Sequence, residues 1–307
     1  MPILKAIGFL SKEGLKKMNP FERVSIIGVG LLGGSLAKVM RKLGLAKSIV
    51  GHGRNKTNLN EAKNLNIIDD AALDIQSAVK DADLIVFCSP VQTISQLAVE
   101  ISPHIKPGCL VTDVGSTKET LVSEMEKLIP KDASFVGAHP IAGSEMSGFH
   151  VSSNTLYDGA HCIVTPTDKT DPSALKRVIE LWETIGAQVS TMSAKEHDFI
   201  FGAISHLPHV VIFALMNTLG SLRSENHDQI TSFAGAGLRD ITRIAGSEPV
   251  MWRDICTSNK DSILYCLDRF QETLNHLRSG IEQENGISLT QQFETANKHR
   301  LNLINNA

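Results

Sequence analysis

The fold of this chain is decided by RVSIIGVGLLGGSLAKVMRKLGLAKSIVGHG at residues 23–53. The first part, RVSII (23–27), is a short apolar run without alternation, which is typical of a strand buried on both faces. A glycine-rich turn, GVGLLGG (28–34), joins it to the helix-like stretch SLAKVMRKLG (35–44), and SIVGHG (48–53) resembles a second buried strand. This succession predicts a βαβ unit.

The turn carries GxGxxG at Gly28, Gly30 and Gly33, directly after a strand and directly before a helix. In this context the three glycines permit a tight turn, a close approach of the backbone to a pyrophosphate, and close packing of helix on strand. The pyrophosphate would lie at the positive end of the helix that starts near Leu31 and Leu32. The motif therefore predicts dinucleotide binding rather than an ordinary glycine-rich turn.

The end of the second strand bears on the choice of dinucleotide. NAD-binding domains of this kind place a carboxylate there, on the ribose hydroxyls, whereas this chain has Gly53 followed by Arg54. A missing carboxylate beside a guanidinium suits a 2′-phosphate, which favours NADP. A purely solvated Arg54 is the alternative, so NAD remains possible.

The rest of the chain predicts two domains. Further strand-like runs lie at 84–88, 110–114, 134–137, 162–165 and 188–191, with helical stretches such as 117–128 and 172–185 between them. Strands that alternate with helices predict an α/β fold, a Rossmann-type, doubly wound, mainly parallel sheet. After Ser193 the chain is a succession of helical patterns. The expected units are an N-terminal extension (1–20), a dinucleotide-binding domain (21–192) and an all-helical substrate and dimerisation domain (193–307).

The helical domain contains an unusually apolar stretch at 198–222, which is hydrophobic on nearly every face. Such a helix is expected to be buried, and in a small domain this indicates packing against a second subunit in a homodimer. Pro208 predicts a kink or a helix start within it. The stretch from Asp261, with apolar residues at helical spacing, predicts another packing helix.

Composition excludes several other classes of protein. The 307 residues include 30 Lys and Arg against 33 Asp and Glu, a formal charge of −3 that offers no basic field to nucleic acid or an anionic membrane. The five cysteines are widely spread without a CxxC pair, as expected for reduced thiols in a cytoplasmic protein. No apolar run is expected to approach the roughly 20 residues that span a bilayer.

Three polar motifs and a pair of arginines follow the fingerprint. They are DVGSTK (113–118), GAHPIAGSEMSG (137–148), SHLPHVV (205–211) and LRDITRIA (238–245). The first two follow predicted strand ends, where open α/β sheets bind ligands. From about residue 23 to the region of Trp252, the order and spacing of these motifs resemble the prephenate/arogenate dehydrogenase family of tyrosine biosynthesis.

The resemblance implies an oxidative decarboxylation of a cyclohexadienol, with hydride transfer to NAD(P)⁺ and no metal. His139 matches the catalytic histidine of the family, and Ser116 matches the serine that orients it near the nicotinamide. His209 and Arg243 match residues that line the substrate pocket, Arg243 being a natural partner for a carboxylate. His206, three residues before His209, is expected to face the same way if the segment is helical.

Some assignments stay open at this stage. Glu145 could pair with a pocket arginine or with an amino group on the substrate, and Ser89 and Pro90 are expected to border the cofactor. Prephenate carries a keto group where arogenate carries an ammonium, and prephenate is preferred because only Glu145 offers an obvious ammonium partner. Arg239 and Arg253 compete with Arg243 for the carboxylate.

Several of these residues also have a purely structural interpretation. His139 could simply brace a turn before a proline, the HxxH pair could bind a metal although no third ligand is evident, and His197 shows nothing that distinguishes it from a surface residue. Two other functions were considered for the whole chain. One is a β-hydroxyacid dehydrogenase or imine reductase on the same plan, which would rely on a lysine, and the other is a non-catalytic NADP sensor.

Overall fold

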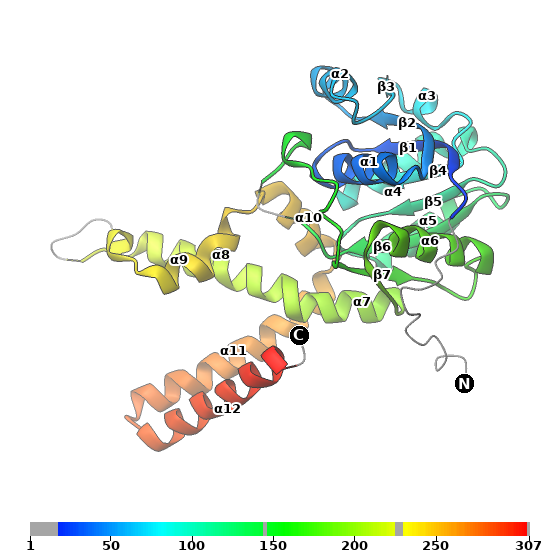
Figure 1. Ribbon diagram of the computed structural model, residues 1–307. Coiled ribbons are helices and arrows are strands. Elements are labelled where there is room, and N and C mark those ends of the chain that lie inside the picture. Colours follow the sequence, from blue (N-terminus) through cyan, green and yellow to red (C-terminus); the bar gives the residue numbers. More distant parts are fainter. Residues whose placement is uncertain (1–17, 144–145, 225–229, 306–307) are drawn as a thin grey trace.

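The computed structural model describes residues 18–143, 146–224 and 230–305. Its first part is a sheet with helices on both faces, and its second part consists of helices that project away from the sheet (Figure 1). The main elements of the first part are β1 (Phe21–Ile27), α1 (Leu31–Leu43), β2 (Ala46–His52), α2 (Lys56–Asn64), β3 (Asp70–Ala72), α3 (Ile75–Val79), β4 (Leu84–Phe87), α4 (Val91–Ile101), β5 (Leu110–Asp113), α5 (Glu119–Leu128), β6 (Ser134–Pro140), β7 (His161–Thr165), α6 (Pro172–Ile185) and β8 (Gln188–Thr191).

The sheet has the strand order β3-β2-β1-β4-β5-β6-β7-β8. Every neighbouring pair is parallel except β6 and β7, which are antiparallel. The chain order reverses between β1 and β4, and such a switch point is where doubly wound sheets bind ligands. The predicted Rossmann-type fold with a mainly parallel sheet is confirmed.

Both faces of the sheet are covered by apolar layers. Ile26 of β1 belongs to the cluster that includes residues of α1 and α6, whereas its neighbour Ile27 belongs to the cluster of α3, α4 and α5. Successive side chains of a strand point to opposite faces, so an uninterrupted apolar run is what this central strand requires.

The elements mostly lie where the sequence predicted them, although several of their bounds differ by a few residues. The helix expected at 35–44 begins four residues earlier, at Leu31, because Gly34 N–H already donates to Gly30 O in its first turn. The short edge strand β3 was not predicted, since its three residues are too few for a recognisable pattern.

The second part contains helices only, within the described ranges. They are α7 (Ala194–Phe201), the π-helical turn η3 (Gly202–His206), α8 (Leu207–Ser221), η4 (Ile230–Phe233), α9 (Ala236–Thr242), η5 (Arg243–Gly246), α10 (Pro249–Ser258), α11 (Lys260–Glu282) and α12 (Gly286–Asn305). The helix expected at 198–222 starts instead at Ala194, where the side chain of Ser193 caps it by accepting from Glu196 N–H. Pro208 lies in the first turn of α8, after the π-helical turn, in agreement with the prediction of a kink or a helix start.

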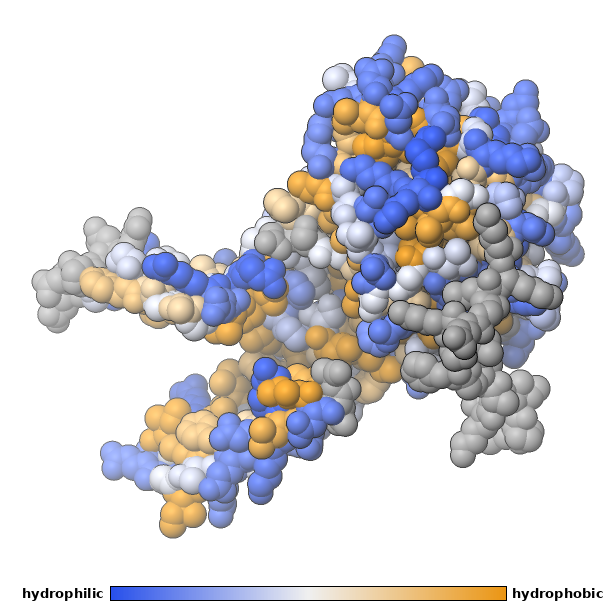
Figure 2. Space-filling view, in the orientation of Figure 1, coloured by the Kyte–Doolittle hydropathy of each residue, from blue (hydrophilic) through white to orange (hydrophobic). Residues whose placement is uncertain are grey.

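Most of the apolar stretch is not buried within the chain. No residue of α8 is buried, and Figure 2 shows apolar patches along the two projecting arms, which are formed by α8 with α9 and by α11 with α12. By length and composition, Ala194–Ser221 is also apolar enough to cross a membrane, so the expectation that no run approaches that length was wrong. Three polar side chains in its first half, His197, Asp198 and His206, are nevertheless buried against other elements of the protein.

Candidate active site

Two glycines of the fingerprint have no room for a side chain, and the third borders open space. Gly28 has a φ of +106°, and a Cβ there would lie 2.7 Å from the carbonyl carbon of Cys88. A Cβ on Gly33 would lie 2.1 Å from Gly28 O. A Cβ on Gly30 would meet no atom within 4 Å, so this glycine keeps open the space through which a pyrophosphate would approach the backbone.

Ser89 and Pro90 follow β4, the strand paired with β1, and so lie at the same end of the sheet as the fingerprint. A Cβ on Gly28 would come within 2.9 Å of Ser89 N, and Pro90 stands at the start of α4. Leu31 and Leu32 begin α1, and the Tyr157 hydroxyl donates to Leu32 O at 2.8 Å. The residues expected to border the dinucleotide thus surround the start of α1.

The end of β2 leaves room for a side chain that the sequence does not supply. Gly53 follows His52, and a Cβ on it would meet only Leu59 Cδ2, at 3.8 Å. Arg54 is exposed beside it. The absence of a carboxylate at this position therefore has no steric cause.

The DVGSTK loop, which follows β5, is built on a buried ion pair. The carboxylate of Asp113 accepts from the Lys118 ammonium, and both side chains are completely buried. It also accepts from the backbone N–H groups of Gly115 at 2.7 Å and Ala138 at 3.1 Å. A Cβ on Gly115 would lie only 2.9 Å from Asp113 Oδ2. The motif residues on either side of Ser116 thus fix the shape of its loop.

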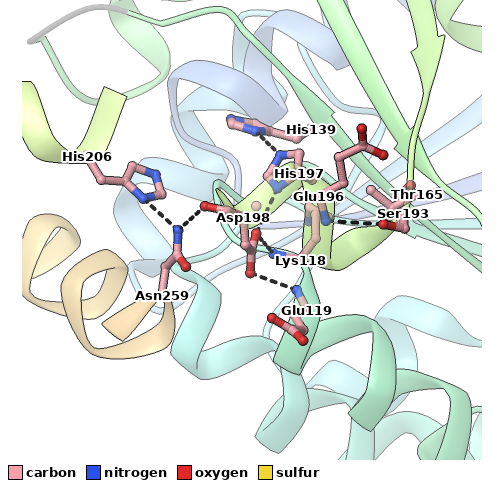
Figure 3. Close-up of polar contacts among 12 residues, drawn as sticks. Lys118, Glu119, His139, Thr165, Ser193, Glu196, His197, Asp198, His206 and Asn259 are labelled. Atoms are coloured by element: carbon pink, nitrogen blue, oxygen red, sulfur yellow. Dashed lines mark hydrogen bonds and ion pairs between the residues drawn. The ribbon is translucent and has the colours of Figure 1, made fainter. Parts of the chain in front are cut away.

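His139 is the second-to-last residue of strand β6 and is half-buried. Its Nδ1 is 2.8 Å from Nε2 of His197, and Nδ1 of His197 is 2.7 Å from Oδ1 of Asp198 (Figure 3). The carboxylate of Asp198 also accepts from the backbone N–H groups of Lys118, at 2.7 Å, and Glu119, at 2.8 Å. These are unpaired N–H groups at the positive start of α5, where a carboxylate is stabilised.

The structure thereby changes the expected surroundings of His139. Ser116 is half-buried in its loop, and within the described residues no hydrogen bond joins it to His139. His197, which the sequence placed among surface residues, is completely buried, and it is the partner of His139. That interpretation of His197 was wrong, because its burial depends on packing between α7 and the sheet.

Electrostatics keep His139 uncharged. Burial, followed by the nearby His197, Lys118 and His206, lowers the pKa of His139 well below its usual 6.5. Burial also lowers the pKa of His197, although the hydrogen bond to Asp198 opposes that shift. A neutral imidazole next to the coenzyme edge is suited to accept a proton near neutral pH.

The two histidines of the HxxH pair both approach Trp252. His209 stacks on its indole with ring centroids 3.7 Å apart, and His206 meets it edge to face at 6.0 Å. The Nδ1 of His209 donates to Ser205 O at 2.9 Å. The pKa of His209 is lowered by burial and by the guanidinium of Arg243, which places this arginine within electrostatic reach.

Asn259 connects His206 to Asp198, the residue that is hydrogen-bonded to His197. Its Nδ2 donates to Asp198 O at 2.6 Å and to His206 Nδ1 at 3.1 Å. Burial lowers the pKa of His206 to about 4. A series of hydrogen-bonded residues therefore runs from β6 through α7 to Asn259, between α10 and α11, and to η3 (Figure 3).

The remaining predicted residues are placed as follows. Arg243 is exposed at the start of η5, and Arg253 is paired with the adjacent Asp254 at 2.6 Å. Glu145 lies outside the described residues. Asn259 and Asp198 were not predicted, because neither lies in a recognisable motif. Asp113 and Lys118 were noted only as members of the DVGSTK motif.

A fingerprint at the switch point of a doubly wound sheet, with a half-buried histidine at the same end of β6, defines a two-domain nicotinamide-dependent dehydrogenase. Family models agree. Residues 36–191 match the model described as prephenate dehydrogenase, nucleotide-binding domain, and residues 193–295 match prephenate dehydrogenase, dimerization domain. The chain belongs to the prephenate dehydrogenase family.

Individual relatives are similar over most of their length. The prephenate dehydrogenase of Bacillus subtilis is 37% identical over 91% of this chain and 75% of its own. The cyclohexadienyl dehydrogenase of Zymomonas mobilis is 32% identical over 93% of this chain and 97% of its own. The crystal structure of prephenate dehydrogenase from Aquifex aeolicus, in complex with hydroxyphenyl propionate and NAD⁺, is 38% identical, covers 92% of this chain and 98% of its own, and superimposes with a TM-score of 0.86.

Proposed function

We propose that the protein catalyses the oxidative decarboxylation of prephenate to 4-hydroxyphenylpyruvate and CO₂, with NAD(P)⁺ as hydride acceptor, in tyrosine biosynthesis. The observation that carries the proposal is His139, a neutral imidazole at the strand edge that also holds the dinucleotide fingerprint. The similarity of the chain to prephenate and cyclohexadienyl dehydrogenases supports the same reaction.

The residues divide the work as follows. Nε2 of His139 accepts the proton of the ring hydroxyl, the nicotinamide ring takes up the hydride from the carbon that bears this hydroxyl, and the ring carboxylate leaves as CO₂. The electrons of the broken C–C bond complete the aromatic ring, and the resulting phenolate oxygen takes the proton back from Nε2 to give the hydroxyl of the product. Ser116, in the loop fixed by Asp113 and Lys118, would contribute a hydroxyl that orients His139. General base catalysis of this kind typically contributes 10²–10⁴-fold to a rate.

The substrate would be held by the helical part. Arg243 supplies a guanidinium for a carboxylate, while His209 and His206 border the same region beside Trp252. Prephenate is the preferred substrate and arogenate is the alternative, in which Glu145 would meet the ammonium group. The name of the Zymomonas relative, cyclohexadienyl dehydrogenase, is compatible with either.

The coenzyme would be held by Gly28, Gly30, Leu31, Leu32 and Gly33, with Ser89 and Pro90 across the switch point. The open space at Gly53 and the adjacent Arg54 support a preference for NADP⁺. The Aquifex relative, which was solved with NAD⁺, makes NAD⁺ the necessary comparison.

The proposal also covers the domain division, the oligomeric state and the location of the protein. We divide the chain into the dinucleotide-binding domain, 21–192, and the helical domain, 193–307, after an extension, 1–20, that lies almost entirely outside the described residues. The helix α8, none of whose residues is buried within the chain, and the match to a dimerization-domain model support a homodimer. A cytoplasmic location is part of the proposal. A monomeric mass in light scattering would contradict the dimer.

The first experiment is an initial-rate assay of nicotinamide reduction in a two-by-two design, prephenate or arogenate with NADP⁺ or NAD⁺. Rapid reduction with prephenate supports the proposed reaction, and a higher rate with arogenate would replace the substrate. The coenzyme ratio tests the role of Gly53 and Arg54. Absence of reduction in all four reactions, with coenzyme binding intact, would refute the proposed function.

A further inference from the structure

The hydrogen bonds around His139 determine which of its nitrogens carries the proton. Asp198 has both carboxylate oxygens occupied by N–H donors from the start of α5, at 2.7 and 2.8 Å, which is an arrangement for an ionised carboxylate. An ionised carboxylate can only accept hydrogen bonds. The Nδ1 of His197, 2.7 Å away, must therefore carry the proton that it donates to Asp198.

The next bond follows from the first. A neutral His197 protonated at Nδ1 has a lone pair on Nε2. His139 Nδ1 lies 2.8 Å from that lone pair, so it must be the donor of this bond and must carry the proton of the neutral His139 ring. The Nε2 of His139 is then left as the acceptor, which is the state a base needs toward a substrate hydroxyl.

We propose that His197 and Asp198 are positioning residues that hold His139 in the tautomer whose Nε2 lone pair faces the substrate. The inference rests on the proposed function, in which this nitrogen accepts the hydroxyl proton. Neither residue touches the substrate in this scheme, and both act through the ring of His139.

The same pair can compensate for a weakness of His139 as a base. Burial and the neighbouring Lys118 disfavour the imidazolium that forms when Nε2 accepts a proton. As the new Nε2–H bond forms, the Nδ1 proton can move toward His197 Nε2, so that the positive charge is shared with the ring hydrogen-bonded to Asp198. No proton is gained or lost by the three residues beyond the one taken from the substrate.

The charged and titratable groups that face the two rings are limited among the described residues. They come from β5 and its loop (Asp113, Lys118), from α7 (Asp198) and from η3 (His206). The charges of Lys118 and Asp113 are paired with each other. Asp198 is therefore the carboxylate that acts directly on the hydrogen-bonded pair of His139 and His197.

Two substitutions of His197 separate the two bonds. In His197→Gln the side-chain oxygen can reach the position of Nε2 and accept from His139, whereas in His197→Asn the shorter amide can bond only Asp198. We expect His197→Asn to lower kcat about 100-fold, with KM and the coenzyme Kd within about twofold of wild type, and His197→Gln to recover most of that loss. Equal activities of the two variants, or wild-type kcat in His197→Asn, would overturn the proposal.

A spectroscopic measurement tests the tautomer without turnover. The full-length protein, labelled with ¹⁵N-histidine, should show His139 with a protonated Nδ1 and an unprotonated Nε2 near neutral pH, its signals being assigned by their loss in His139→Asn. In His197→Asn this preference should weaken. A wild-type His139 protonated at Nε2 refutes the inference even if the dehydrogenase assay succeeds, and a failed assay with the expected tautomer refutes only the proposed function.

Discussion

His139 and His197 lie 58 residues apart in the sequence and are joined by a 2.8 Å contact between Nδ1 of the first and Nε2 of the second. His139 belongs to β6 of the sheet, and His197 belongs to α7, the first helix after it. Their rings meet edge to face at 5.0 Å, and the ring of Phe201 lies 5.0 Å from that of His139. The side chain proposed as the base is therefore held by residues that the nucleotide-binding part alone does not supply.

Replacing His139 by asparagine should lower kcat with the preferred substrate by about 10²–10⁴-fold, because the proton acceptor is lost. The coenzyme Kd, measured by fluorescence titration, should stay close to that of wild type. Full activity in this variant would remove His139 from the proposed mechanism.

The pH dependence of kcat/KM should reflect the neutral state of His139. Since the pKa of His139 is lowered well below 6.5, protonation inactivates the free enzyme only at a more acidic pH. The rate should therefore stay level as the pH falls to 6.5 and decline below it. An acidic limb centred above that value, measured over the range in which the protein stays folded, would contradict a depressed pKa.

Two alanine substitutions in the fingerprint should behave differently. In Gly33→Ala the new Cβ would lie 2.1 Å from Gly28 O, so overpacking should cost about 1–3 kcal/mol of unfolding free energy. In Gly30→Ala the Cβ meets no protein atom within 4 Å, so stability should hardly change while coenzyme affinity falls. Thermal unfolding and coenzyme titration of both variants provide the comparison.

Gly53→Asp should shift the coenzyme preference toward NAD⁺. A Cβ at Gly53 has room, with only Leu59 Cδ2 at 3.8 Å, and the new carboxylate would bond ribose hydroxyls and repel a 2′-phosphate. One charge-assisted hydrogen bond corresponds to about a tenfold change in the ratio of kcat/KM values. An unchanged ratio would show that the end of β2 does not select the coenzyme, and Arg54→Ala is the matched test of the guanidinium.

Lys118→Met should destabilise the protein strongly, because Asp113 would keep a buried charge without its ammonium partner. Breaking one side of a buried ion pair typically costs about 3–5 kcal/mol. Lys38→Met, which removes an ammonium that donates to Ser152 O, serves as a control at a partly buried site. A similar loss in both variants, measured by denaturant unfolding, would argue against a special role for the Asp113–Lys118 pair.

The sequence predicted the nucleotide-binding fold well, because its signals are local. A buried strand shows as an apolar run, and the fingerprint glycines fall at fixed offsets from β1 to α1. The end of β8 and the bounds of α6 were predicted to the residue. The short strand β3 was not predicted, because three residues are too few to show a periodic pattern.

The surroundings of His139 were predicted less well, because they depend on packing between distant segments. His139 stands beside a recognisable motif, whereas His197 and Asp198 follow only a helix cap at Ser193, which is common to many helices. Asn259 offered even less, since its two hydrogen bonds reach residues 53 and 61 positions away. Ser116, which the motif pairs with His139, contacts it through no described hydrogen bond.

Asp198 has a mechanical consequence beyond the proton it orients. The segments matched by the two family models meet at residue 192, where a hinge between domains would ordinarily be sought. Here the carboxylate of Asp198, in the second segment, accepts hydrogen bonds from two backbone N–H groups at the start of α5, in the first segment. Rotation at this junction would strip a buried charge of its donors. The contact between α5 and α7 therefore ties the two segments together at this junction, so that they are expected to move as one body there.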